Sequence, residues 1–237
     1  MIGQWIDVAL FKKSPEQVAK EADMMNGFKN VAVAALITAV VTSILGGIAA
    51  IANSAYNFGI MGAGLGIVAA VVGFIVSIIL APIVTVILFG IVVGVFHLIA
   101  KLLGGKGSYS SMVGAIGIIN ASIAMTYMLV LAIISGTIGI FAIGLIAPIV
   151  KIILIPIAFA QFVASLVELY LTIKAIAAIQ KFSMLKAAIT VLIPILILII
   201  IAIILFVILI VLSVILGATF IPAMTGYSGL DGLFGLM

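Results

Sequence analysis

The sequence predicts an all-α, polytopic integral membrane protein: a five-span helical bundle preceded by a short amphipathic helix. Of its 237 residues, 67% are apolar and 7% are charged, whereas a soluble domain carries about 25% charged residues. The apolar residues form long runs that reach the roughly 20 residues needed to cross a bilayer. All ten basic residues are lysines scattered at the ends of these runs, which is typical of topology determinants and not of a nucleic-acid-binding surface.

Residues 1–30 form the one segment polar enough to lie in water or at the membrane interface. One helical face of this segment carries Ile2, Trp5, Ile6 and Leu10. Trp5 suits the interface between membrane and water. Ser14 and Gln17 have the spacing of a capping box and predict a helix start. We interpret the segment as a cytosolic or interfacial helix lying in the membrane plane, with a partner-binding segment as the alternative.

The first three spans are predicted at 31–51, 67–100 and 111–134. The second run is longer than one perpendicular crossing requires, so we expect it to tilt, protrude or bend at Pro82. Residues 53–66 contain glycines and no charge, and they are expected to connect the first two spans.

The run that follows residue 137 is ambiguous because it is too short for two full spans and a loop. It contains Pro148 and Pro156. We interpret 138–155 as an interfacial or re-entrant piece, since irregular backbone at membrane depth needs cover from protein or water. The remaining predicted segments are a fourth span at 157–178, a fifth span at 185–216 and an external tail at 217–237.

Lysine asymmetry predicts the orientation of the chain. With five spans and a cytosolic N-terminus, nine of the ten lysines lie inside and Lys151 alone lies outside, as the positive-inside rule favours. Six spans, with 138–155 crossing separately, would reduce the asymmetry to six against three and leave Lys151 in the membrane. The pattern therefore favours five spans and an external C-terminus.

A charged, glycine-rich break between the second and third spans carries His97, Lys101, Gly104, Gly105 and Lys106. It does not fit a phosphate loop, which would need glycine at position 100 and Ser or Thr at position 107; the chain has Ala100 and Gly107 there. A metal site at His97 would need further ligands, and the chain has no second histidine and no cysteine. We predict a helix C-cap and tight turn at a cytosolic corner, with His97 as a hydrogen-bonded packing residue.

This corner resembles the Yip-domain family, the Ypt/Rab-interacting multi-span membrane proteins. Residues 97–109 read His-x3-Lys-Leu-Leu-Gly-Gly-Lys-Gly-Ser-Tyr, and the second span of that family similarly ends in a histidine, a basic residue and a Gly-Gly pair. Residues 182–187 and 8–15 are similar to two further family patterns. The resemblance implies five spans, a cytosolic N-terminus and, in eukaryotic members, vesicle trafficking with small GTPases. The short segment before the first span favours a prokaryotic or archaeal member.

Glu168 is the only acidic residue within the predicted spans, and an intramembrane carboxylate is a candidate functional group by default. It lies about 15 Å inside the bilayer counted from Ala178, and Asn120 lies about 14 Å from Ser111 by the same helical rise. We therefore expect the two to share a hydrogen bond, with Gln161 two turns away on the face of Glu168. This cluster could fix helix registry, or it could form a proton or ion relay.

Nothing in the sequence resembles a catalytic set, so we predict neither an enzyme nor a bound cofactor. The predicted function is a scaffold or adaptor in a prokaryotic cell membrane, acting through contacts with membrane lipids and with a membrane-protein partner or a second copy. The alternatives are a small oligomeric channel or transporter, with Glu168 and Asn120 in its path, and an accessory subunit of a larger complex. Polar residues are sparse in the spans, which favours the scaffold.

Overall fold

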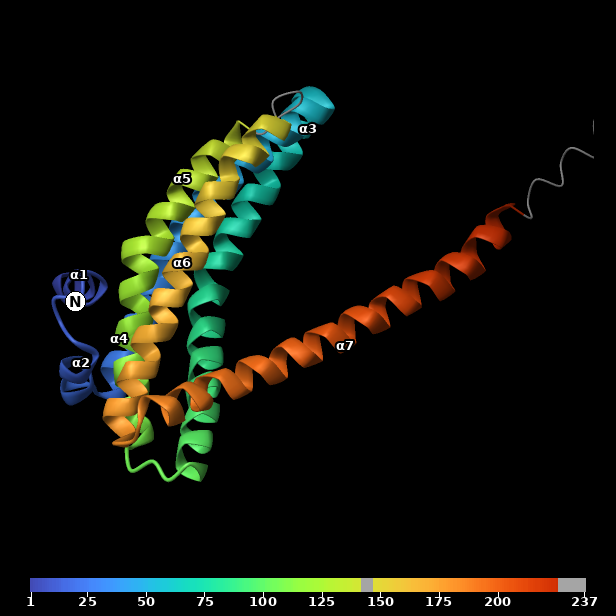
Figure 1. The fold of residues 1–237 in the computed structure, drawn as a ribbon. Coiled ribbons are helices and arrows are strands. Elements are labelled where there is room, and N and C mark those ends of the chain that lie inside the picture. The colour runs from blue at the N-terminus through green and yellow to red at the C-terminus, as the bar shows by residue number, and fades with distance from the viewer. Residues whose placement is uncertain (142–146, 226–237) are drawn as a thin grey trace, which may run out of the picture. The chain divides into compact units, whose positions relative to one another are not determined.

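The computed structural model describes residues 1–141 and 147–225, whose regular structure is entirely helical (Figure 1). The helices are α1 (Ile2–Ala9), α2 (Pro15–Glu21), α3 (Met24–Leu102), α4 (Tyr109–Ile123), the π-helical turn η1 (Ala124–Met128), α5 (Leu129–Ile140), α6 (Ala147–Gln180) and α7 (Met184–Thr225). Four helical segments are long and apolar enough to cross a membrane: Met24–Leu102, Tyr109–Ile140, Pro148–Gln180 and Met184–Ser213. The protein is therefore an all-helical candidate membrane protein.

The chain divides into two compact units, residues 1–191 and 192–237. In the second unit, residues 192–225 continue α7, and their large apolar side chains from Leu192 to Leu212 are exposed wherever they are described. Residues 226–237 of the predicted external tail lie outside the described residues.

Helix α3 is a helical hairpin. Its only non-helical backbone is at Gly59, where φ is +63° and ψ is −147°, a conformation that glycine adopts readily because it has no Cβ. Beyond this residue the helix returns along itself, so closely that a Cβ on Gly66 would lie 2.8 Å from the Cα of Ile51. The expected connection over 53–66 is therefore a reversal at Gly59 alone. The small residues around it let the two halves of α3 pack closely while both remain helical up to Gly59.

Two more helices are longer than predicted. The run α4–η1–α5 continues past residue 134 to Ile140, and α6 begins at Ala147 and stays helical through Pro156. Residues 147–155 of the predicted interfacial piece at 138–155 therefore belong to α6, and its residues 142–146 lie outside the described residues. Proline is tolerated inside a membrane helix because neighbouring groups can take up the freed carbonyl.

Helix α1 packs on the bundle through Trp5, which is only 3% exposed. The indole Nε1 donates a hydrogen bond to Asn30 Oδ1 over 2.6 Å, and the Tyr127 hydroxyl donates to the Ala9 carbonyl over 2.8 Å. Trp5 thus faces the bundle and hydrogen-bonds inside it, and its position at the membrane interface stays a prediction. The other members of that face remain exposed: Ile2, Ile6 and Leu10.

Helix α2 begins with the predicted capping box. The Gln17 backbone N–H donates to Ser14 Oγ over 3.3 Å, and the Ser14 N–H donates to Gln17 Oε1 over 2.8 Å. The pKa of Glu16 is lowered, mainly by a hydrogen bond from its own backbone N–H and then by the Ser14 hydroxyl, with a further contribution from the Lys174 cation of α6. Helix α2 packs on α4 and α6, and its one ion pair in the described part of the chain joins Lys13 to Glu21.

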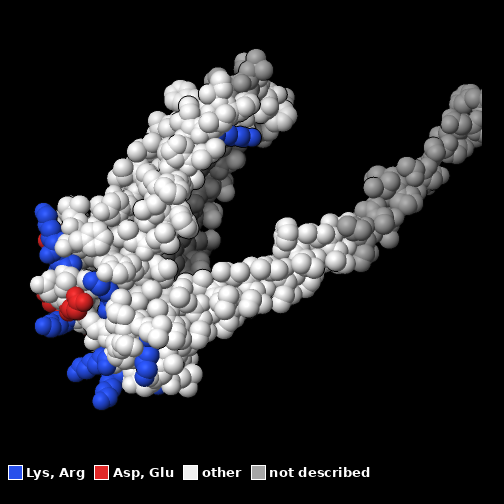
Figure 2. All heavy atoms as spheres, viewed as in Figure 1, with Lys and Arg blue, Asp and Glu red and all other residues white. Residues whose placement is uncertain are grey.

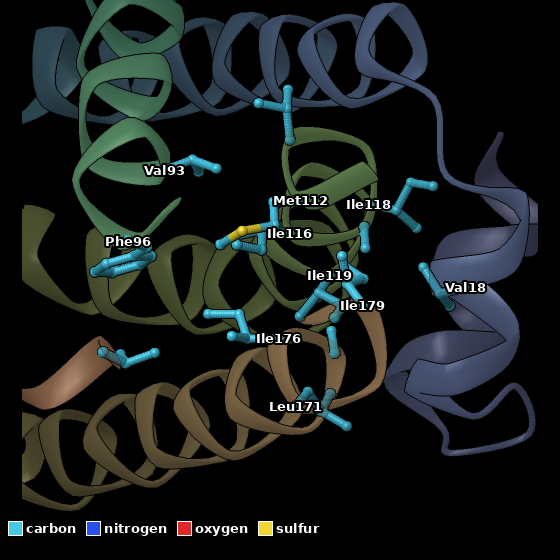
Figure 3. Close-up of a cluster of buried hydrophobic side chains, with 14 of the residues drawn as sticks. Val18, Val93, Phe96, Met112, Ile116, Ile118, Ile119, Leu171, Ile176 and Ile179 are labelled. Carbon is cyan, nitrogen blue, oxygen red and sulfur yellow. The ribbon is translucent and has the colours of Figure 1, made fainter. Parts of the chain in front are cut away.

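The main hydrophobic core lies where α2, the end of α3, the start of α4 and the end of α6 meet (Figure 3). Met112, Ile119 and Ile176 are fully buried there, and Val18 of α2 and Phe96 of α3 close its sides. Charged side chains gather around the same end of this unit, and one separate cationic group lies toward the opposite end (Figure 2). The best-packed end of the bundle is thus also its charged end.

Candidate functional site

The predicted corner after α3 is a helix C-cap of the Schellman type. Gly105 N–H donates to the Ala100 carbonyl over 2.8 Å, and Gly104 N–H donates to the Lys101 carbonyl over 3.0 Å. Gly104 has a φ of +88°, as this motif requires of its left-handed residue. The predicted C-cap and tight turn are therefore confirmed, and the glycines of the corner have a structural reason.

Gln180 joins this corner to the end of α6, and sequence reasoning did not single it out. Its side chain is fully buried. Its Oε1 accepts a hydrogen bond from Gly107 N–H over 2.9 Å, its Nε2 donates to Met112 Sδ over 2.8 Å, and its backbone carbonyl accepts from Lys106 N–H over 3.1 Å. The glycine-rich corner after α3 and the end of α6 thus form one structural element, centred on a buried amide.

His97 packs beside this amide. Its Nδ1 lies 3.4 Å from Met112 Sδ and 3.5 Å from Gln180 Nε2, and its ring meets Tyr109 edge-on at 5.9 Å between centroids. Among the described residues, 1–141 and 147–225, no three His, Asp or Glu side chains are placed to share a metal ion. Lys101 and Lys106 are exposed at the same corner, so its chemistry is that of a packed turn with a cationic surface.

The second group of predicted residues lies between α4 and α6. Asn120 Nδ2 donates a hydrogen bond to Glu168 Oε1 over 2.7 Å, and both side chains are half-buried. Gln161 lies seven residues earlier on α6, about 10 Å along the helix axis, and its backbone carbonyl accepts the Ser165 hydroxyl over 3.1 Å. The structure brings Asn120 and Glu168 together and leaves Gln161 apart from them.

An open cavity of about 300 Å³ lies between the two halves of α3 and α4, and Asn120 is part of its lining. Its polar lining residues are Thr38 and Thr42 from the first half, Thr85 from the second half and Asn120 from α4. The remaining lining residues are alanines and one valine. Sequence reasoning missed these threonines because the reversal at Gly59, which brings them together, has no distinctive sequence pattern.

No protein-family profile, curated protein or solved structure matches this chain.

Proposed function

We propose that the chain crosses the membrane five times, with its N-terminus in the cytosol and its C-terminus outside. The reversal at Gly59 supports two crossings by α3, because each half exceeds the roughly 20 residues that a bilayer core requires. On α6, Lys174 and Lys151 are 23 residues apart, about 34 Å at 1.5 Å per residue. This separation fits a hydrocarbon core of about 30 Å with one lysine near each face.

The proposed function is a scaffold or adaptor in a prokaryotic plasma membrane, of the kind that the resemblance to Yip-domain proteins suggests. The observation that carries it is the extent of exposed apolar side chains along the second half of α3 and along α7, including Ile87 at 56% and Leu205 at 55% exposure. Contiguous apolar surface of this extent marks contact with lipid or with another membrane protein. The proposed partners are membrane lipids and either a membrane-protein partner or a second copy.

Cysteine labelling tests the proposed topology, because the natural chain contains no cysteine. We expect a membrane-impermeant maleimide to label Phe58→Cys, Lys151→Cys and Ser228→Cys in intact cells, and to label Lys106→Cys only after permeabilisation. Phe58 lies beside the α3 reversal, Lys151 and Lys106 are exposed, and Ser228 belongs to the predicted tail. Labelling of Phe58→Cys and Lys106→Cys under the same condition would rule out two crossings by α3.

Photo-crosslinking tests the scaffold. Benzoylphenylalanine is placed at Ile87 or Leu205, with fully buried Ile119 as the control position. We expect adducts to a second protein chain or to a discrete retained lipid from the two exposed positions and none from Ile119. A protein that purifies in mild detergent as a monomer, with adducts only within its own chain or to bulk lipid, would contradict the scaffold.

A further inference from the structure

Four exposed lysines lie around the corner where α3 ends and α7 begins. Lys106 N–H donates to the Gln180 carbonyl over 3.1 Å, and Lys186 Nζ donates to the Leu103 carbonyl over 3.1 Å. These two contacts hold the loop after α3 beside the end of α6 and the first turn of α7. We call the four exposed side chains on this surface the lysine patch: Lys101, Lys106, Lys181 and Lys186.

The lysine patch accounts for the whole net charge of the chain. The two segments that form it, 97–109 and 180–191, contain no acidic residue. Residues 1–30, by contrast, contain four lysines and four acidic residues. The six lysines outside the patch are matched by the six acidic residues of the chain, so the formal charge of +4 equals that of the patch. On the face seen in Figure 2, the blue side chains at the lower end have no red neighbours.

Large apolar side chains lie beside these lysines. Leu102 follows Lys101 and is 86% exposed, and Leu185 precedes Lys186 and is 71% exposed. Acyl chains would remove this apolar surface from water, which is favourable, while the neighbouring lysines extend their ammonium groups to the headgroups. Both leucines lie at the ends of candidate spans, Met24–Leu102 and Met184–Ser213. The proposed topology therefore places the patch at the level of the headgroups.

We propose that the lysine patch binds the headgroup of an anionic phospholipid of the cytosolic leaflet. A cluster of at least four basic residues at the cytosolic end of a span attracts anionic lipids, and each lysine near the surface raises the affinity about fivefold. The exposed leucines favour a lipid over an acidic protein segment, because a lipid carries acyl chains next to its charge. The inference rests on the proposed membrane topology and names one class among the proposed lipid partners.

Native mass spectrometry of the full chain in mild detergent tests the patch, with phosphatidylglycerol and the zwitterionic phosphatidylcholine added at equal concentrations. We expect the natural chain to retain phosphatidylglycerol preferentially. The double variant Lys101→Gln/Lys106→Gln should lower its affinity for this lipid about 25-fold, fivefold for each lysine. Lys12→Gln/Lys20→Gln is the matched control, because it removes two exposed charges from the charge-balanced segment 1–30. Its affinity should equal that of the natural chain.

Equal retention of the two lipids by the natural chain would overturn the proposal, as would equal losses of phosphatidylglycerol from the two double variants. Displacement of the lipid by inorganic phosphate or by an acidic peptide would also overturn it, because the acyl chains would then contribute nothing. A chain that retains both lipids equally would lose the patch and keep its proposed lipid contact. A chain that retains neither lipid would contradict the proposed lipid partners as well.

The salt response of the natural chain decides the question if Lys101→Gln/Lys106→Gln fails to fold. Raising the ionic strength from about 0.1 to 1 M shortens the Debye length from about 10 to 3 Å. Binding of phosphatidylglycerol should then weaken roughly tenfold or more, because exposed charges are screened at this distance. An unchanged affinity would exclude the patch as the binding site.

Discussion

The Gly117→Ala variant is expected to lose about 3 kcal/mol of folding free energy, the upper part of the range for overpacking a core. A Cβ at position 117 of α4 would lie 2.6 Å from the carbonyl oxygen and 2.7 Å from the Cα of Gly27 at the start of α3. Both atoms belong to the backbone, so no side chain can rotate to make room. The two helices would have to move apart, and the contacts along their crossing would weaken together.

Thermal or denaturant unfolding in detergent checks this result against Gly73→Ala in α3. Beyond the backbone of its own helical turn and its chain neighbours, no atom lies within 4 Å of a Cβ built at Gly73, so alanine there should be neutral or stabilise the helix by about 0.5–1 kcal/mol. Equal unfolding temperatures for Gly117→Ala and Gly73→Ala would show that α3 and α4 do not approach each other closely at Gly27 and Gly117. The comparison separates the loss of a close approach from the general effect of replacing glycine in a helix.

Local signals in the sequence predicted the ends of elements well. The capping box at Ser14 and the C-cap at Gly104 depend on residues within a few positions of each other, and both are present in the structure. The Asn120–Glu168 contact followed from comparing depths along two helices, which needs only the helical rise. These features could be predicted because each follows either from residues close together in sequence or from the depth of a residue in the membrane.

The packing faces could not be predicted, because in a membrane bundle both the core-facing and the lipid-facing residues are apolar. The burial of Trp5 therefore had no signal in the spacing of α1, and the contact of Gly27 with Gly117 had none in either helix. The cavity threonines are separated by the whole α3 hairpin, from Thr38 to Thr85. Whether these threonines lie close together depends on the residue at which the chain reverses. The uncharged segment around Gly59 contains no sequence signal that identifies this residue.

Gln180 exemplifies a residue whose role depends on three separate segments. It is the last residue of α6 and the first of several polar residues in sequence, and this position suggests a solvated loop. In the structure it is buried between the glycine corner, α4 and α6, with both ends of its amide engaged. A polar residue at a span end is ordinarily exposed, so only the tertiary contacts reveal that this one holds the corner.

We expect Gln180→Leu to destabilise the corner by about 2 kcal/mol, within the cost of leaving a hydrogen-bonding group without its partner. Leucine cannot accept from Gly107 N–H or donate to Met112, so both groups lose the contact made by the amide. A local opening made easier by 2 kcal/mol corresponds to roughly thirtyfold faster exchange. Hydrogen exchange of the Lys106 and Gly107 amides, measured by mass spectrometry, reports this change directly.

Gln161→Leu is the matched control, because the same substitution on α6 falls on a half-buried side chain away from the corner. Its effect on stability should stay within about 0.5 kcal/mol, as for surface substitutions in general. Exchange at Gly107 that is equally slow in both variants would mean that the backbone turn, with its glycine cap, holds the corner without Gln180. Faster exchange in Gln180→Leu alone would make the buried amide the link between the glycine-rich corner and the end of α6, and this link requires both to lie on the same side of the membrane.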